Sequence, residues 1–100
     1  MRNIMLFCAG GMSTSILVKK MEAAAAAQGY DVTISAHALA QVDELGPQAD
    51  ILLLGPQVRF QMAGVKAKFP DKPVEAINPR DYGIMNGEAV IAEVKKVLGD

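Results

Sequence analysis

Apolar residues along this 100-residue chain occur either in short unbroken runs or at helical spacing. The unbroken runs are Ile4-Met5-Leu6-Phe7 and Ile51-Leu52-Leu53-Leu54. A strand that is covered on both faces has this pattern, so segments 3–7 and 50–54 are predicted to be central strands of a parallel sheet. Segment 31–37 alternates between apolar and polar residues, which favours a strand at the edge of the sheet.

Helical spacing follows each of these strands. Segment 13–28 has one apolar face and stops at Gly29, and a second apolar stripe begins after Asn86, a residue type that caps helices. A third helix is predicted from an apolar series after the second central strand, and weaker patterns predict a short helix at 39–45 and a short strand at 74–77. The three apolar series are Leu17, Met21, Ala24 and Ala25; Val58, Met62, Val65 and Phe69; and Val90, Ile91, Val94, Val97 and Leu98.

Alternation of strands and helices predicts an α/β fold with right-handed crossovers. Placing the two fully apolar strands at the centre gives a four-stranded parallel sheet of order 2-1-3-4, with helices on both faces. The length suits a single domain over residues 1–100. In such a sheet the ligand site lies beyond the carboxyl ends of the strands, at the point between strands 1 and 3 where the winding reverses.

Composition narrows the range of partners. The net charge is −1 and the chain has one cysteine and one histidine. We expect no nucleic-acid partner, because there is no excess of basic residues, and no disulfide or structural zinc site. No apolar run is long enough to span a bilayer and no secretory signal is evident, so we expect a cytoplasmic monomer without direct membrane insertion.

The strongest chemical signal follows the first strand, at Cys8-Ala9-Gly10-Gly11-Met12-Ser13-Thr14-Ser15. Two glycines allow the backbone N–H groups to curl inward, and the start of a helix adds unpaired N–H groups and the positive end of its dipole. Such a loop stabilises a phosphate or a thiolate. The sequence therefore predicts a nucleophilic Cys8 at the floor of a phosphate-binding loop that runs from Ala9 to Ser15.

Position 14 separates two kinds of phosphate chemistry. Cysteine-based tyrosine phosphatases have a similar loop with an arginine where this chain has Thr14. Without that guanidinium, the loop lacks the charged fork that grips a planar transition state. This favours holding and passing on a phosphoryl group over hydrolysing it.

Two further segments are candidates for lining the site. Gly55-Pro56-Gln57 directly follows the second central strand and is expected at the same edge as Cys8, although it could be only a turn. Asp81 and Tyr82 follow the last strand. Asp81 would act as a general acid in a phosphatase, or else lie in a surface turn, and His37 is expected simply to be exposed at the end of its strand.

These segments together resemble a known family. Leu6-Phe7-Cys8 with the loop up to Ser15, Leu53-Leu54-Gly55-Pro56-Gln57, Lys72-Pro73-Val74-Glu75 and Tyr82-Gly83 are similar to the IIB component of the lactose, cellobiose and diacetylchitobiose branch of the bacterial phosphoenolpyruvate-dependent sugar phosphotransferase system (PTS). The resemblance covers the whole chain, 1–100.

The resemblance implies a phosphotransferase whose Cys8 takes a phosphoryl group from a phosphohistidine of a IIA protein. Cys8 would pass it to a β-disaccharide bound in a IIC membrane permease, with which the chain associates transiently, and no metal or cofactor is needed. The sugar itself is not predicted, because the permease binds it. Two alternatives remain open: a low-molecular-weight cysteine phosphatase with Asp81 as its acid, and a non-catalytic sensor of the same fold.

Overall fold

The computed structural model describes residues 1–9 and 12–100, and the side chains of residues 1–9 and 14–100. Four parallel strands form one sheet with the order β2-β1-β3-β4, which confirms the predicted fold class. The elements are β1 (Arg2–Cys8), α1 (Met12–Ala27), β2 (Val32–Ala38), η1 (Leu39–Gln41), α2 (Val42–Leu45), η2 (Gly46–Gln48), β3 (Ile51–Leu54), η3 (Pro56–Gln61), α3 (Met62–Lys68), β4 (Val74–Ala76), α4 (Pro79–Gly83) and α5 (Gly87–Leu98), where η marks a 3-10 helix.

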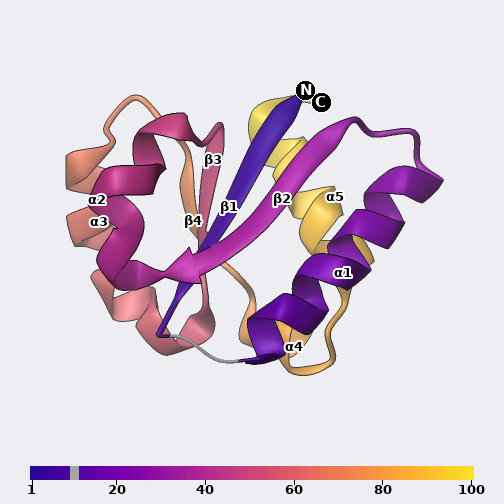
Figure 1. Cartoon of the computed structure of the whole chain (residues 1–100), viewed down its shortest axis with the longest axis horizontal. Helices are drawn as coiled ribbons and strands as arrows, with labels where there is room; N and C mark the ends of the chain where they lie inside the picture. Colours follow the sequence, from indigo (N-terminus) through magenta and orange to yellow (C-terminus); the bar gives the residue numbers. More distant parts are fainter. Residues whose placement is uncertain (10–11) are drawn as a thin grey trace.

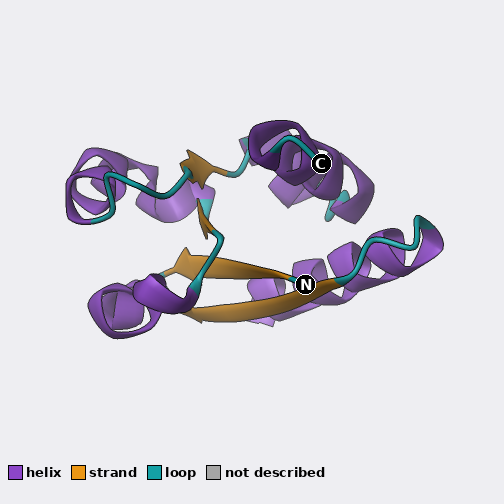
Figure 2. Ribbon diagram, turned by 90° about the horizontal axis from the view of Figure 1, so that it is seen from above, coloured by secondary structure: helices purple, strands orange, loops and turns teal. Residues whose placement is uncertain are grey.

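Helices cover both faces of the sheet. Helices α1 and α5 lie on one side and α2 and α3 on the other, as the views in Figures 1 and 2 both show. Strands β1 and β3 lie in the middle and β2 forms an edge, as the hydrophobic pattern predicted. A sheet covered on both faces needs apolar side chains in both directions, which explains the two unbroken runs.

The pleat of β1 divides the core into two halves. Ile4 and Leu6 pack with α1 and α5, whereas Met5 and Phe7 pack with the residues of α2 and α3. Successive side chains of a strand point to opposite faces, so the even positions of β1 belong to the α1–α5 side. Cys8 is the next even position of this strand.

Helices α1 and α5 approach each other closely at Gly87. A Cβ atom at this position would lie 2.4 Å from the carbonyl carbon of Lys20 in α1. Backbone atoms cannot move aside as a flexible side chain can, so the first residue of α5 has to be glycine for this contact. Asn86 caps the helix as predicted, since its side chain accepts a hydrogen bond from the Ala89 amide.

Two local predictions were wrong. The segment after β3 is not one helix: the 3-10 helix η3 precedes α3, and Val58 has non-helical backbone angles (φ −120°, ψ 16°). The buried Val58 side chain belongs to the α2–α3 half of the core. The turn after Pro79 is the short helix α4, whose Asn78 cap accepts a hydrogen bond from the Arg80 amide.

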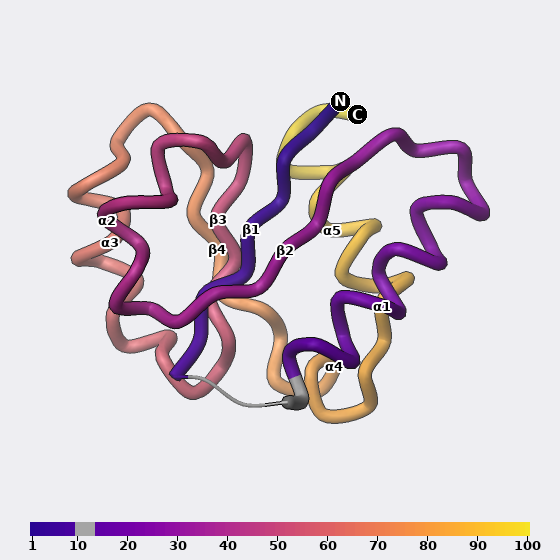
Figure 3. Tube along the Cα trace, viewed as in Figure 1, coloured from indigo at the N-terminus to yellow at the C-terminus, as the bar shows by residue number. Residues whose placement is uncertain are grey.

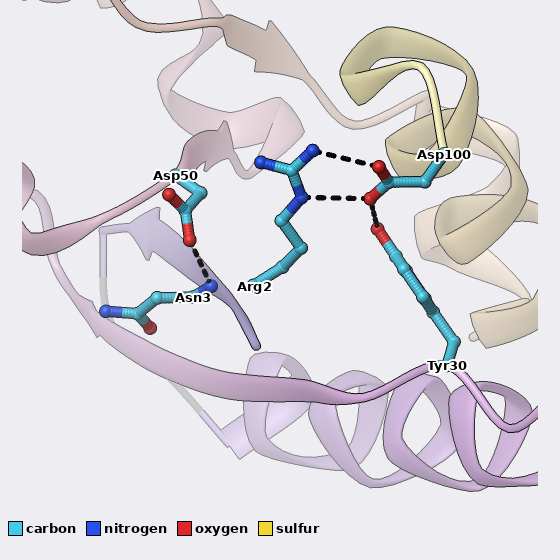
Figure 4. Close-up of polar contacts among 5 residues, drawn as sticks. All are labelled: Arg2, Asn3, Tyr30, Asp50 and Asp100. Atoms are coloured by element: carbon cyan, nitrogen blue, oxygen red, sulfur yellow. Dashed lines mark hydrogen bonds and ion pairs between the residues drawn. The ribbon is translucent and has the colours of Figure 1, made fainter.

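The first and last described residues lie side by side at the end of the sheet where β1 begins (Figures 1 and 3). Cys8 lies at the other end, the carboxyl edge of the sheet. Arg2 donates two hydrogen bonds to Asp100, of 2.9 and 3.0 Å, and the Tyr30 hydroxyl donates a third (Figure 4). The hydrogen bond from Arg2 is the main cause that lowers the pKa of Asp100 to about 2. Burial, followed by the bond to Asp100, raises the pKa of Tyr30 to about 12.

Candidate functional site

Cys8 lies at the carboxyl end of β1, between the ends of β2 and β3. Only 4% of the Cys8 surface is exposed. In the sheet it is level with Ala38 of β2, and the next position along β3 is Gly55, whose amide donates to the Phe7 carbonyl at 2.8 Å. The thiol therefore lies at the point where the winding of the sheet reverses, which is where an open α/β sheet binds its ligands.

Two hydroxyl groups extend from the thiol in a hydrogen-bonded chain. Thr14 Oγ1 lies 2.9 Å from Cys8 Sγ and 3.0 Å from Tyr82 Oη. Thr14 comes from the first turn of α1 and Tyr82 from α4, and both are buried. Among the residues whose burial is described, Thr14 is the only buried one with a polar or charged side chain apart from Cys8 and Tyr82. A buried hydroxyl needs such partners to offset its lost hydration.

Either atom of each pair could be the donor, and the charge on the sulfur selects the direction. A thiolate or thiophosphate sulfur can only accept, so Thr14 must donate its one proton to Cys8. The Thr14 oxygen can then only accept from Tyr82, and the Tyr82 hydroxyl donates to it. With a thiolate at Cys8, the arrangement directs two O–H dipoles toward the sulfur in series, which stabilises the negative charge there.

Gly55 packs closely against Cys8 on the β3 side. A Cβ atom at position 55 would lie 2.9 Å from the Cβ of Cys8 and 2.9 Å from the amide oxygen of Gln57. Only glycine permits this approach of backbone to the cysteine. The predicted segment Gly55-Pro56-Gln57 therefore lies at Cys8, with Gly55 buried, Pro56 half-buried and Gln57 exposed.

A cavity of about 230 Å³ opens beside the thiol on the β2 side. Its lining residues are Cys8, Thr14, Ser15, Ala36, His37, Ala38 and Gln41. The sheet register nevertheless pairs His37 with Phe7, and their rings are in contact with centroids 5.7 Å apart. Nε2 of His37 lies 2.9 Å from Ser35 Oγ. The imidazole thus packs on the half of the core opposite to Thr14 and Tyr82.

The predicted phosphate loop is only partly within the described residues. Gly10 and Gly11 lie outside them, as do the side chains of Met12 and Ser13, which open α1. Ala9 is exposed, Ser15 is exposed and lines the cavity, and Thr14 contacts the thiol. The first turn of α1 contains no acidic residue, so no side-chain carboxylate offsets the positive end of its dipole.

Comparison with known proteins agrees with this arrangement. Residues 3–93 match the family described as "PTS system, Lactose/Cellobiose specific IIB subunit". The chain belongs to this family. It is therefore a IIB component of the lactose and cellobiose type, a phosphotransferase component of a sugar PTS.

Curated relatives cover nearly the whole chain. The galactose-specific EIIB component of Lactococcus lactis subsp. cremoris and the cellobiose-specific EIIB component of Lactococcus lactis subsp. lactis are each 43% identical, over 95% of this chain and 94% of theirs. The oligo-beta-mannoside-specific EIIB component of Bacillus subtilis is 34% identical, over 98% of this chain and 97% of its own. The resemblance to the IIB family is thus confirmed.

Solved structures share the fold of this IIB component. The cellobiose-specific IIB component of Borrelia burgdorferi superposes with a TM-score of 0.74 at 41% identity, covering 91% of this chain and 85% of that one. The lactose-specific IIB domain of Streptococcus pneumoniae gives a TM-score of 0.80 at 17% identity, with 92% and 95% covered. At that identity the second comparison supports the fold alone.

Asp81 does not join Cys8 in this IIB component. It lines a separate cavity of about 310 Å³ between β4 and α5, together with Glu75, Asn78 and Glu93. Its neighbour Tyr82 reaches Thr14 instead. Of the two candidates after the last strand, the structure thus brings only Tyr82 to the thiol. No group of three metal-ligating side chains occurs within residues 1–9 and 12–100, and no helix there is long and apolar enough to cross a membrane.

The sequence did not indicate that the end of β2 lines the cavity beside Cys8. Ala36, Ala38 and Gln41 are an ordinary strand end and turn, and no residue type among them points to chemistry. The available signal was the predicted sheet order, since an edge strand beside β1 must end near Cys8. His37 was expected to be exposed, but Phe7 covers one side of its ring and it is half-buried.

Proposed function

We propose that Cys8 is the phosphoryl carrier of this IIB component and that residues 1–100 form a single PTS IIB domain. The observation that carries the proposal is the chain of hydroxyl groups from Tyr82 through Thr14 to the Cys8 sulfur. A lone cysteine packed only as a small apolar residue would not need two donors in series. The helix that starts four residues after Cys8 adds its positive end to the same place.

In the first transfer, the Cys8 thiolate attacks the phosphorus of a phosphohistidine on a IIA protein. The S–P bond forms, the N–P bond breaks, and the imidazole nitrogen keeps the electron pair. The backbone amides of the loop from Ala9 to Ser15 and the hydroxyls of Ser13 and Ser15 hold the phosphoryl oxygens during this step, while Thr14 donates to the sulfur. Phosphoryl transfer depends mainly on such positioning and electrostatic stabilisation.

In the second transfer, a hydroxyl of a sugar bound in the IIC permease attacks the phosphorus of phosphocysteine. The O–P bond forms, the S–P bond breaks, and Cys8 is recovered as thiolate while the hydroxyl proton leaves to solvent. We propose a β-disaccharide of the cellobiose, diacetylchitobiose or lactose class, which agrees with the sugars named for the relatives. The chain would act at the cytoplasmic side of that permease, as a monomer.

Hydrolysis is disfavoured by two features. Position 14 is a neutral threonine whose side chain is already engaged with Cys8 and Tyr82, so no guanidinium is available at this point. Asp81, the acid that a phosphatase would use, lines a cavity to which Cys8 does not contribute. Both features support a carrier over a phosphatase.

The surface at the carboxyl edge of the sheet suits docking of the IIA donor. Among the described residues four large apolar side chains are exposed: Met1, Ile16, Phe60 and Ile84. Ile16 lies near the start of α1, Phe60 in η3 and Ile84 at the end of α4. These three segments all begin where a strand ends, at the carboxyl edge of the sheet where Cys8 lies, called the thiol edge below. Exposed apolar groups at one edge are typical of protein-binding surfaces.

The decisive experiment is intact-protein mass spectrometry after incubation with phosphoenolpyruvate, enzyme I, the histidine phosphocarrier and a IIA protein of the cellobiose or lactose class. We expect one added phosphoryl group on the wild-type chain and none on Cys8→Ser, which keeps the fold. The phosphoryl group should then be transferred from the wild-type chain to a β-disaccharide in IIC-containing membranes. Absence of any adduct with several phosphorylated IIA proteins would overturn the carrier proposal.

A further inference from the structure

The Gln57 side chain extends toward Cys8 on the β3 side, whereas the cavity formed with β2 lies on the β2 side. Its amide oxygen and the Cβ of Cys8 both lie 2.9 Å from the place that a Gly55 Cβ would occupy. Two atoms at that distance from one point are at most twice that distance apart. The carboxamide is therefore folded back over Gly55 toward Cys8, although the residue is exposed.

The backbone holds Gln57 in this place. Pro56 fixes the first turn of η3, and the Val58 amide donates to the Gly55 carbonyl at 3.0 Å. The Val58 side chain is buried in the α2–α3 half of the core. The backbone of Gln57 is thus held between Gly55, at the end of β3, and the buried Val58. Because this backbone is already ordered, binding of a ligand costs little conformational entropy.

The carboxamide has no other evident task. Within the described residues its oxygen and nitrogen form no hydrogen bond with a protein group. Packing cannot explain its position, because the side chain is exposed. A carboxamide offers an N–H₂ donor as well as an oxygen acceptor, and rotation about its last bond exchanges the two.

We propose that the Gln57 carboxamide donates to a non-bridging oxygen of the phosphoryl group on Cys8 and orients that group for in-line transfer. This inference rests on the proposed function. Thr14 and Tyr82 act from one side at the sulfur, whereas Gln57 would act from the β3 side at the phosphoryl oxygens. A neutral donor suits a carrier, since it steadies the group without the tight hold of a guanidinium that would slow its release.

The test compares Gln57→Glu and Gln57→Ala with the wild-type chain in single-turnover transfer from a phosphorylated IIA protein of the cellobiose class. Glutamate keeps the shape but replaces the donor with an anion. We expect the rate at saturating donor to fall about tenfold in Gln57→Ala and further in Gln57→Glu, because one hydrogen bond to the phosphoryl group is lost and then replaced by repulsion. The donor concentration for half-maximal rate should change little.

One further readout and one matched control separate this role from a structural one. The ³¹P resonance of phosphocysteine should shift in both variants, since the environment of its oxygens changes. The matched control is Gln48→Glu, which makes the same charge change in η2, before β3 and at the opposite edge of the sheet. It should transfer at the wild-type rate.

The outcomes separate this inference from the carrier proposal. If the wild-type chain is phosphorylated on Cys8 but both Gln57 variants match it in rate and ³¹P shift, the role of Gln57 is refuted and the carrier proposal stands. If Gln57→Glu and Gln48→Glu slow transfer equally, net charge explains the effect and the inference also fails. If the wild-type chain accepts no phosphoryl group, the carrier proposal itself fails.

Discussion

Thr14 Oγ1 lies 2.9 Å from Cys8 Sγ although the two residues lie on opposite sides of the loop between β1 and α1. The same oxygen contacts Tyr82, which is 68 positions further along the chain. A single hydroxyl thus joins the end of the first strand to the helix that follows the last strand. Any change at Thr14 affects both the chemistry and the packing of α4.

Thr14→Val should slow phosphoryl transfer and destabilise the fold. Valine has nearly the same shape but removes both hydrogen bonds and leaves the buried Tyr82 hydroxyl without its partner, which costs about 1–3 kcal/mol. We expect a lower unfolding free energy in urea and a transfer rate reduced at least tenfold. A transfer rate equal to wild type would show that the thiol does not depend on this donor.

Tyr82→Phe should have a smaller effect, because Thr14 keeps its bond to Cys8. In the double variant Thr14→Val/Tyr82→Phe no buried hydroxyl is left unpaired, so it should be more stable than Thr14→Val alone. A double-mutant cycle of urea unfolding measures this coupling. Additive losses of stability would contradict a direct bond between the two hydroxyls.

Gly55→Ala should destabilise the chain by about 1–3 kcal/mol, since the new methyl would lie 2.9 Å from the Cys8 Cβ. That atom is fixed by the strand and cannot rotate away. The control is Gly64→Ala in α3, where a Cβ atom meets nothing within 4 Å. There alanine should stabilise the helix by about 0.5–1 kcal/mol. Equal effects at both glycines would refute the close approach at Cys8.

Phe60→Ser should weaken binding of the phosphorylated IIA donor without affecting the fold, because the side chain is 76% exposed. We expect the donor concentration for half-maximal transfer to rise several-fold, while the rate at saturation and the thermal midpoint stay close to wild type. Ala92→Ser, at an exposed position on α5, is the control. An unchanged dependence on donor concentration would remove Phe60 from the docking surface.

The Arg2, Tyr30 and Asp100 cluster predicts how stability depends on pH. The folded state lowers the pKa of Asp100 from 3.8 to about 2, so its contribution is present above pH 4 and is lost as pH falls toward 2. The folded state raises the pKa of Tyr30 from 10.0 to about 12, so its contribution is lost as pH rises between these values.

Asp100→Asn should therefore flatten the acid side of the profile of thermal midpoint against pH, and Tyr30→Phe the alkaline side. Asp71→Asn, an exposed aspartate between α3 and β4, should leave both sides as in the wild type. An acid side that is identical in Asp100→Asn and in the wild type would mean that the cluster does not contribute to folding.

Much of the fold could be predicted because pattern and burial agree. The unbroken runs of β1 and β3 identified the central strands, and the alternation in β2 identified an edge strand. The break at Val58 could not be predicted, since Val58 keeps the helical spacing of the apolar series although its backbone angles are not helical. Asn78-Pro79 is a start signal for a helix as well as a turn signal, which explains why α4 was missed.

The residue type of the nucleophile could be predicted from the sequence, but the contacts around it could not. Cys8 stands out because its residue type, its strand and its loop all indicate the same chemistry. Thr14 and Tyr82 were candidates, but no sequence pattern shows that two hydroxyls 68 positions apart share a hydrogen bond. The family resemblance favoured Tyr82 over Asp81, and the structure agrees, since Tyr82 contacts Thr14 whereas Asp81 lines a separate cavity.

The ion pair between Arg2 and Asp100 lies at the end of the sheet opposite to Cys8. A chemical label attached beside either residue would therefore not cover the thiol edge. A biotin or fluorescent label joined to either end should leave the edge that contains Cys8, with the exposed Gln57 and Phe60, facing the solution. Immobilisation through such a label orients every molecule in the same way on a sensor surface. Donor and acceptor proteins would then meet a uniform layer of accessible thiol edges.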